Sequence, residues 1–342
     1  MNVKKREDSY LSLNQLKKGD LLLFRDVEYP QFVKPYFKNL MENFTILIDK
    51  LIIFASDPDK NPDLFYTHAA LLYDNLESTG GTVAEATIPR CQLRSPITNK
   101  SFSVTVRRVS DNKDGSQVLK YLPDLSDSKQ ADSYAILQAV MAGIAILLRL
   151  RVAKDNKLLN AALAFLKLFL YPLGKKLDSY IEKFQKTDQA WFCSQLASYC
   201  YDMTAKETGD TAFLLKTPAS LDITDTILEY LIKNNTNITA TKIDYNRYES
   251  LNLESEELLT SGLNFANILE HKENDFVGEP LTASDHNEIA VIALDFINKV
   301  SKLCGIQFDK DNIEQSLINF QTAFIMPIDL INCLEEVGEY YV

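Results

Sequence analysis

Two short apolar runs beside a glycine pair constrain the fold of this chain most strongly. Residues 66–73 and 82–87 are rich in small, apolar and β-branched side chains, and Gly80-Gly81 leads into the second run. Runs of this length that are bounded by turn residues are typical of β-strands. We therefore predict two adjacent antiparallel strands, joined by a loop longer than a tight hairpin.

Two other runs also predict strands. Residues 21–24 are wholly apolar and follow the turn Lys18-Gly19-Asp20. A short apolar run of this kind predicts a buried strand. Residues 101–107 alternate polar and apolar side chains, which predicts a strand with one polar face. Together with the helical segments elsewhere in the chain, these runs predict an α+β fold built on an antiparallel sheet.

Two helical insertions are expected between and after these strands. The first, at about 31–55, has apolar helical spacing and ends at the breaker cluster of residues 56–63. The second, at 131–172, contains two almost wholly apolar segments separated by Asp155-Asn156-Lys157. Neither segment reaches the ~20 apolar residues that span a bilayer, so we interpret 131–172 as a buried helical hairpin. The alternative is a peripheral contact with lipid or a membrane surface through 135–170, flanked by lysines.

The polar run 234–237 predicts a boundary after residue 233. Residues 1–233 then form the first domain, and 234–342 form a helical accessory region that is a candidate surface for a protein partner. Its pattern predicts helices at 258–272, 285–303, 312–324 and 329–337. We find no internal repeat and no chemical motif in this region.

Composition excludes several functional classes. The formal net charge of −11, without a basic cluster, argues against nucleic acid as a ligand. Five cysteines at irregular spacing do not form a disulfide framework. Only three histidines are present and metal-binding spacings are missing, so we expect neither a transition-metal site nor a cofactor. Residues 1–6 are not followed by an apolar core, so we expect no secretory signal and a cytoplasmic environment, or release of an effector by a non-Sec route.

Cys193 lies where a helix is predicted to begin. Leu196, Ala197 and Cys200 follow it at the spacing of a buried helical face. Free backbone N–H groups and the helix dipole at this position favour the thiolate over the thiol. The same N–H groups can stabilise the oxyanion that forms when a thiolate attacks a carbonyl. The alternative is a small buried structural thiol.

His68 and Glu85 are polar side chains within the two apolar strands that open this section. A cysteine hydrolase needs a thiolate, an imidazole that accepts and returns a proton, and a polar group that orients the ring. Glu85 could otherwise be a solvated residue of an edge strand. Histidine on one strand, carboxylate on the next and cysteine at the start of a helix together predict a catalytic site of His68, Glu85 and Cys193.

Four motifs resemble the circularly permuted NlpC-type papain-like cysteine hydrolases, in particular the YiiX-like group, which is related to the lecithin:retinol acyltransferase-like proteins. They are residues 19–22 (Gly-Asp-Leu-Leu), 67–73 around His68, 83–86 around Glu85, and 192–196 (Phe-Cys-Ser-Gln-Leu). In that family the histidine precedes the cysteine, as it does here. Residues 217–221 resemble a loop that follows the cysteine helix in this group, and residues 326–330 resemble it nearly as well.

The resemblance implies a papain-like core in which Cys193 is the nucleophile, His68 the base and Glu85 the group that orients the imidazole. It implies that the backbone N–H of Cys193 is part of the oxyanion hole. The expected activity is a cysteine hydrolase or acyl transferase that acts on an amide, ester or thioester of a peptide or acyl-bearing substrate. The alternative is a catalytically vestigial binding module, such as a bacterial effector, that acts through its C-terminal helices.

Overall fold

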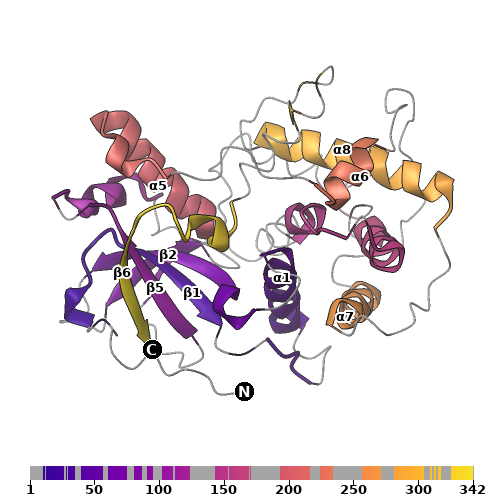
Figure 1. Cartoon of the computed structure of the whole chain (residues 1–342), viewed down its shortest axis with the longest axis horizontal. Helices are drawn as coiled ribbons and strands as arrows, with labels where there is room; N and C mark the ends of the chain where they lie inside the picture. Colours follow the sequence, from indigo (N-terminus) through magenta and orange to yellow (C-terminus); the bar gives the residue numbers. More distant parts are fainter. Residues whose placement is uncertain are drawn as a thin grey trace.

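The computed structural model gives an α+β fold with a six-stranded antiparallel sheet and several helices (Figure 1). With short breaks, the structure describes residues 11–34, 40–56, 61–74, 81–86, 91–94, 102–123, 143–170, 193–215, 224–233, 256–270, 281–303, 309–316 and 325–341. The strand order is β4-β3-β2-β1-β5-β6, and all neighbouring strands are antiparallel. The strands are β1 (Leu21–Asp26), β2 (Tyr66–Asp74), β3 (Thr82–Ala86), β4 (Cys91–Arg94), β5 (Phe102–Arg108) and β6 (Glu335–Tyr341).

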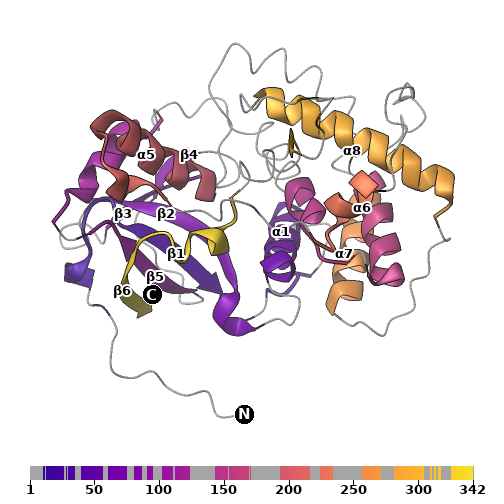
Figure 2. The ribbon, with the colours of Figure 1, turned by 45° about the horizontal axis from the view of Figure 1, so that its top comes forward.

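The four predicted strands are confirmed as β1, β2, β3 and β5. Alternation along the strands divides their apolar side chains between two faces. Leu21 and Leu23 of β1 belong to a core that also contains Leu196 and Tyr201 of helix α5 (Cys193–Thr208). Leu22 and Phe24 of β1 belong to a separate core on the opposite face, which also contains Leu16 from the segment before β1. Helix α5 therefore covers one face of the sheet (Figure 2).

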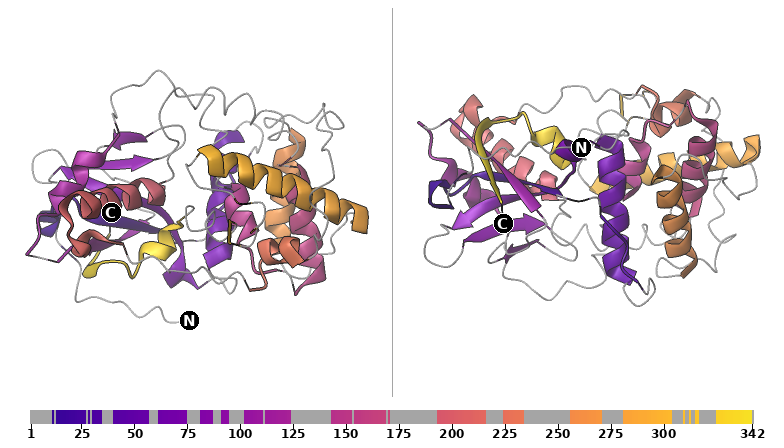
Figure 3. Two further views of the ribbon diagram at one scale, coloured as in Figure 1. Left: turned by 90° about the horizontal axis from the view of Figure 1, so that it is seen from above. Right: turned by 60° about the horizontal axis from the view of Figure 1, so that its bottom comes forward.

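The remaining helices form a second lobe. It contains α1 (Leu40–Ser56), helical residues 143–148 and 156–168, α6 (Ile227–Lys233), α7 (Glu256–Glu270) and α8 (Ala283–Leu303). Both views of Figure 3 place the sheet with α5 at one end of the molecule and α6, α7 and α8 at the other, with α1 between them. These helices share one hydrophobic core, to which stretches far apart in the sequence contribute. A single lobe thus unites both insertions with the C-terminal helices.

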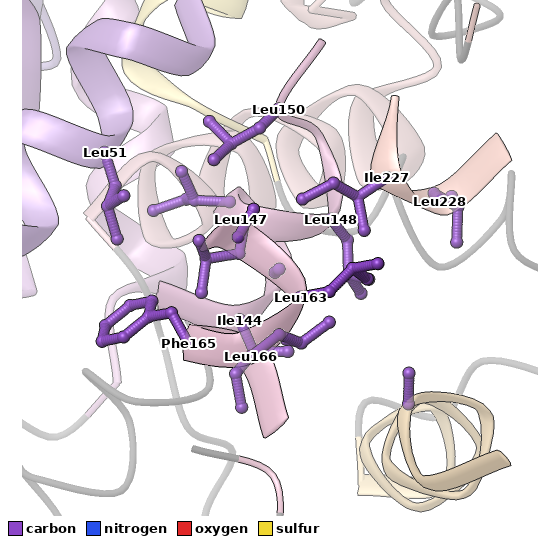
Figure 4. Packing of buried hydrophobic residues seen from close by; sticks show 14 of the residues in the cluster. Leu51, Ile144, Leu147, Leu148, Leu150, Leu163, Phe165, Leu166, Ile227 and Leu228 are labelled. Carbon is purple, nitrogen blue, oxygen red and sulfur yellow. The ribbon is translucent and has the colours of Figure 1, made fainter. Parts of the chain in front are cut away.

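The described part of the 131–172 insertion is buried in this lobe. The side chains of Ile144, Leu148 and Leu163 are fully buried and pack together with Ile227 of α6 (Figure 4). The backbone N–H of Ile227 also donates to the carbonyl of Leu150 at 3.0 Å. These apolar side chains are therefore already covered by protein. Among the described residues, no helix combines the length and the hydropathy needed to cross a membrane.

The end of the chain differs from the prediction. The helix expected at 329–337 is wrong, because residues 335–341 form β6 and pair with β5. In this register Glu335 lies opposite Arg108 and Glu336 opposite Arg107, so acidic and basic side chains face each other across the strands. The accessory region of 234–342 is therefore not wholly helical, and its last strand belongs to the same sheet as β1. Predicted helices 258–272 and 285–303 are confirmed as α7 and α8, whereas most of 312–324 lies outside the described residues.

Candidate active site

The strand register brings His68 and Glu85 together. Ala70 of β2 lies directly opposite Glu85 of β3, and His68 is two residues before Ala70 on the same face of the sheet. His68 and Glu85 are therefore diagonal neighbours, a separation that long side chains can bridge. The Nε2 atom of His68 lies 2.9 Å from Oε2 of Glu85. Phe24 of β1 packs against the imidazole, with ring centroids 5.3 Å apart.

Cys193 is the first residue of α5, which packs against β2 and β3. Its side chain hydrogen-bonds the imidazole of His68. Because Nε2 of His68 contacts Glu85, the Nδ1 atom is left for the thiol. Cys193 is partly exposed, whereas Cys200, two turns further along α5, is fully buried. Of these two cysteines, Cys193 is therefore the more accessible to a reagent.

The electrostatics of this pair favour its charged form. Burial raises the pKa of the Cys193 thiol, but the charge and hydrogen bond of His68, with hydrogen bonds from the backbone N–H groups of Ala69 and Ser194, lower the pKa below its ordinary value. Burial lowers the pKa of His68, but the thiolate and Glu85 outweigh this effect and raise the pKa to about 10. Both shifts favour a thiolate beside an imidazolium over the neutral thiol and imidazole.

Glu85 is a buried carboxylate with three partners. Besides His68, its Oε1 atom forms an ion pair with Nε of Arg94 at 2.8 Å and accepts a hydrogen bond from Nε2 of Gln92 at 3.1 Å. Burial raises the pKa of Glu85, but the contacts with His68, Arg94 and Gln92 outweigh it and leave the pKa below its ordinary value. Glu85 is not an edge-strand residue, because β4 lies outside β3 and Gln92 pairs directly with Glu85. The short run of β4 was not predicted from the sequence.

Two further carboxyl groups near the site were also missed. Asp26, at the end of β1, accepts a hydrogen bond from Oγ1 of Thr67 at 2.9 Å, and burial raises its pKa to about 6. Asp49 comes from α1, which packs against β2. Burial raises the pKa of Asp49 well above its ordinary value, and the charges of Asp26 and Cys193 raise it further. In the sequence, an aspartate in a helix is more typical of a solvated face, so no local signal marked Asp49.

The other sequence candidates lie away from this site or outside the described residues. His286 is in α8, where its Nδ1 atom contacts the hydroxyl of Tyr230 at 2.5 Å. Trp191, Phe192 and His271 lie outside the described residues. Within the described part of the chain, no group of three or more His, Cys, Asp or Glu side chains is placed to hold a metal ion.

No protein-family model, curated protein or solved structure matches this chain. A function is therefore inferred from the geometry of the Cys193 site and from the chemistry that its side chains can perform.

Proposed function

We propose that the chain is a cysteine hydrolase or acyl transferase that acts through an acyl-enzyme intermediate on Cys193. One observation carries the proposal: the imidazole of His68 contacts Cys193 on one side and the buried carboxylate of Glu85, at 2.9 Å, on the other. This is the arrangement of nucleophile, base and orienting group that thiol-dependent acyl transfer needs. The partly exposed position of Cys193 at a helix start and the burial of Glu85 suit these two roles.

In the proposed reaction, the Cys193 thiolate attacks the carbonyl carbon of an amide, ester or thioester. The backbone N–H of Cys193, at the start of α5, would donate to the resulting oxyanion. The His68 imidazolium then protonates the leaving amine, alcohol or thiol as the bond to carbon breaks. Neutral His68 next takes a proton from water, or from an acceptor amine or hydroxyl, which attacks the thioester and releases Cys193. Glu85 holds the imidazole in orientation throughout.

We further propose that the sheet and α5 are a permuted papain-like core. The order of the motifs supports this assignment, since the histidine strand and the acidic strand precede the cysteine helix, as in the YiiX-like group. Residues 326–330, one of two candidates for the loop beside the cysteine helix, contribute to a short helix that contacts α5 and β2. Residues 217–221, the other candidate, lie outside the described residues.

Alkylation of thiols by iodoacetamide, followed by peptide mass mapping at pH 6 and pH 7, tests the reactivity of Cys193. We expect Cys193 to react much faster than free cysteine at pH 6, because its thiolate is stabilised. His68→Ala should abolish this advantage. Equal rates for the wild-type protein and His68→Ala would contradict the proposal.

Turnover is tested with p-nitrophenyl acetate, a generic activated ester. We expect a burst of nitrophenolate equal to the amount of protein, together with an acetyl adduct on Cys193 seen by intact mass. Cys193→Ala should show neither. If the wild-type protein also shows neither, while Cys193→Ala keeps the biological effect of the protein, a binding module replaces the enzyme as the better explanation.

A further inference from the structure

A short segment near the end of the chain joins the two lobes beside the Cys193 helix. It contains the 3₁₀ helix η7 (Pro327–Leu330), which contacts β1, β2 and α5 and is the short yellow helix beside the sheet in Figure 1. Met326 is buried in the core of the helical lobe, and Leu330 is buried in the core between the sheet and α5. Ile328, between them, packs against both cores. The segment is therefore held from both sides.

On the side of the helical lobe, Arg149 binds this segment through Asp329. Its Nη1 and Nη2 atoms donate to the two carboxylate oxygens of Asp329 at 2.8 and 3.0 Å. The two side chains are only 10% and 11% exposed. Two parallel hydrogen bonds fix the relative orientation of guanidinium and carboxylate as well as their distance. Asp329 also accepts the backbone N–H of Met326 at 2.8 Å, so the same carboxylate fixes the first turn of η7.

On the side of the sheet, the segment holds the first turn of α5. The hydroxyl of Ser194 donates a hydrogen bond to the carbonyl oxygen of Ile325. Ser194 is buried and is the residue directly after Cys193. Its backbone N–H is one of the groups that hydrogen-bond the Cys193 side chain and lower its pKa. The thiol is therefore linked to residue 325 through the hydrogen bond of Ser194 and the peptide unit between Cys193 and Ser194.

We infer that Arg149 is a positioning residue for Cys193. Through Asp329, it fixes the segment from Ile325 to Leu330 against the helical lobe, and this segment sets the position of the first turn of α5 relative to His68. The inference rests on the proposed function, because it assigns Arg149 a role in aligning the thiolate with the imidazolium. The helical lobe then helps to position Cys193, because Arg149 directly follows helical residues 143–148 of that lobe.

The test is the pH profile of Cys193 alkylation by iodoacetamide between pH 4 and 9, measured on the full chain. Replacing Arg149 by Met removes the two hydrogen bonds but keeps an apolar stem. We expect the apparent pKa of Cys193 to rise, and the rate at pH 6 to fall about tenfold for each unit of that rise. Asp329→Asn, which keeps an acceptor for Met326, should shift the profile in the same direction. Arg149→Lys, which keeps the charge without the fork, should give an intermediate profile.

Lys167→Met is the matched control. Lys167 is also a mostly buried cation of the helical lobe, but it pairs with Asp285 at 2.7 Å and Glu288 at 3.2 Å of α8. Its loss should lower the thermal midpoint without changing the alkylation profile. The inference is overturned if the profile stays at the wild-type position in both Arg149→Met and Asp329→Asn, or if Lys167→Met moves it equally.

His68→Ala, measured in the same series, separates failure of the inference from failure of the proposed function. If His68→Ala shifts the profile and the Arg149 and Asp329 variants do not, the positioning role alone is wrong. If none of the variants shifts it, no imidazole-stabilised thiolate exists, and both the proposed function and the positioning role fail.

Discussion

Replacing Glu85 by Gln should weaken the thiolate–imidazolium pair without changing the shape of the site. The amide is nearly isosteric with the carboxylate but carries no charge to stabilise the His68 imidazolium. A hydrogen bond to a charged group contributes about 1.5–3 kcal/mol, and one unit of pKa corresponds to about 1.4 kcal/mol. From the 2.9 Å contact between Nε2 of His68 and Oε2 of Glu85, we expect the pKa of His68 to fall from about 10 by roughly one to two units.

The consequence for Cys193 follows from the shared proton. When the imidazolium is less stable, the neutral thiol–imidazole form gains population relative to the ion pair. The rate of iodoacetamide alkylation at pH 5–6 should fall by about 10- to 100-fold, the factor that corresponds to one to two pKa units. At pH 9–10, where thiolate forms without help from His68, the difference between Glu85→Gln and wild type should shrink. The full pH profile of the rate, read by intact mass, is the measurement.

Glu336→Gln provides the control for this experiment. Glu336 is also a carboxylate of the sheet that pairs with an arginine, at 3.0 Å from Nη2 of Arg107, but it lies on β6 and is 55% exposed. This variant should keep the wild-type profile. A Glu85→Gln variant that is folded, as judged by its thermal midpoint, and yet alkylates at the wild-type rate across the whole pH range would show that Glu85 does not stabilise the imidazolium.

Three further predictions concern stability. The pKa of His68 is raised to about 10 from 6.5. Its contribution to the stability is therefore fully present below about pH 6.5 and is lost as the pH rises through 10. In urea unfolding at pH 6.5, 8 and 10, the difference in the free energy of unfolding between wild type and His68→Gln should shrink as the pH rises. Leu163→Ala should lower the free energy of unfolding by about 2–5 kcal/mol, because Leu163 is fully buried in the helical lobe; unchanged urea midpoints would contradict this packing. Burial raises the pKa of Asp49, so ionisation of Asp49 opposes folding once the pH exceeds the pKa that this group has in the unfolded chain. Between pH 4 and the pKa of Asp49 in the folded protein, Asp49→Asn should therefore gain stability relative to wild type by up to about 1.4 kcal/mol per pH unit. The absence of any gain would contradict the burial of Asp49.

The sheet could be predicted because its strands carry local signals. Small and apolar runs marked β2 and β3, and a histidine in the first run and a carboxylate in the second marked His68 and Glu85. What the sequence alone could not supply is the register that makes these two residues diagonal neighbours, since register depends on the pairing of whole strands. Arg94 and Gln92 were missed for the same reason. Their four-residue strand is too short to show a period, and only its pairing with β3 places them on Glu85.

The helical lobe was predicted in pieces but not as one body. Each helix has the spacing of an amphipathic or apolar segment, which predicts that a face is buried without saying against what. Ile144 shares one hydrophobic core with Ile227 of α6, and α1 packs against α7, whose residues come some two hundred positions later in the chain. Division of the chain at residue 234 therefore followed a change in local composition, whereas packing across that position decides which segments belong together.

The error at the end of the chain has a specific cause. Residues 335–341 lack alternation of polar and apolar side chains, so a helix fitted their composition as well as a strand did. Gly338 has a φ of 148°, which is incompatible with a helix and strained for any other residue, and a Cβ there would meet Leu11 at 2.9 Å. The pairing of Glu335 and Glu336 with Arg108 and Arg107 is a long-range contact that composition cannot reveal.

The end of the chain also explains why the site depends on the whole molecule. Ser194 donates a hydrogen bond to the carbonyl oxygen of Ile325, which lies 131 residues further along the sequence. The strand that follows this segment of residues 325–330, β6, pairs with β5. Helices α6, α7 and α8 of the second lobe lie between α5 and this segment in the sequence, and Arg149 of the same lobe donates hydrogen bonds to Asp329. Contacts of such large sequence separation form only after intervening loops have closed. The position of the first turn of α5 therefore depends on contacts between segments that lie more than a hundred residues apart in the sequence.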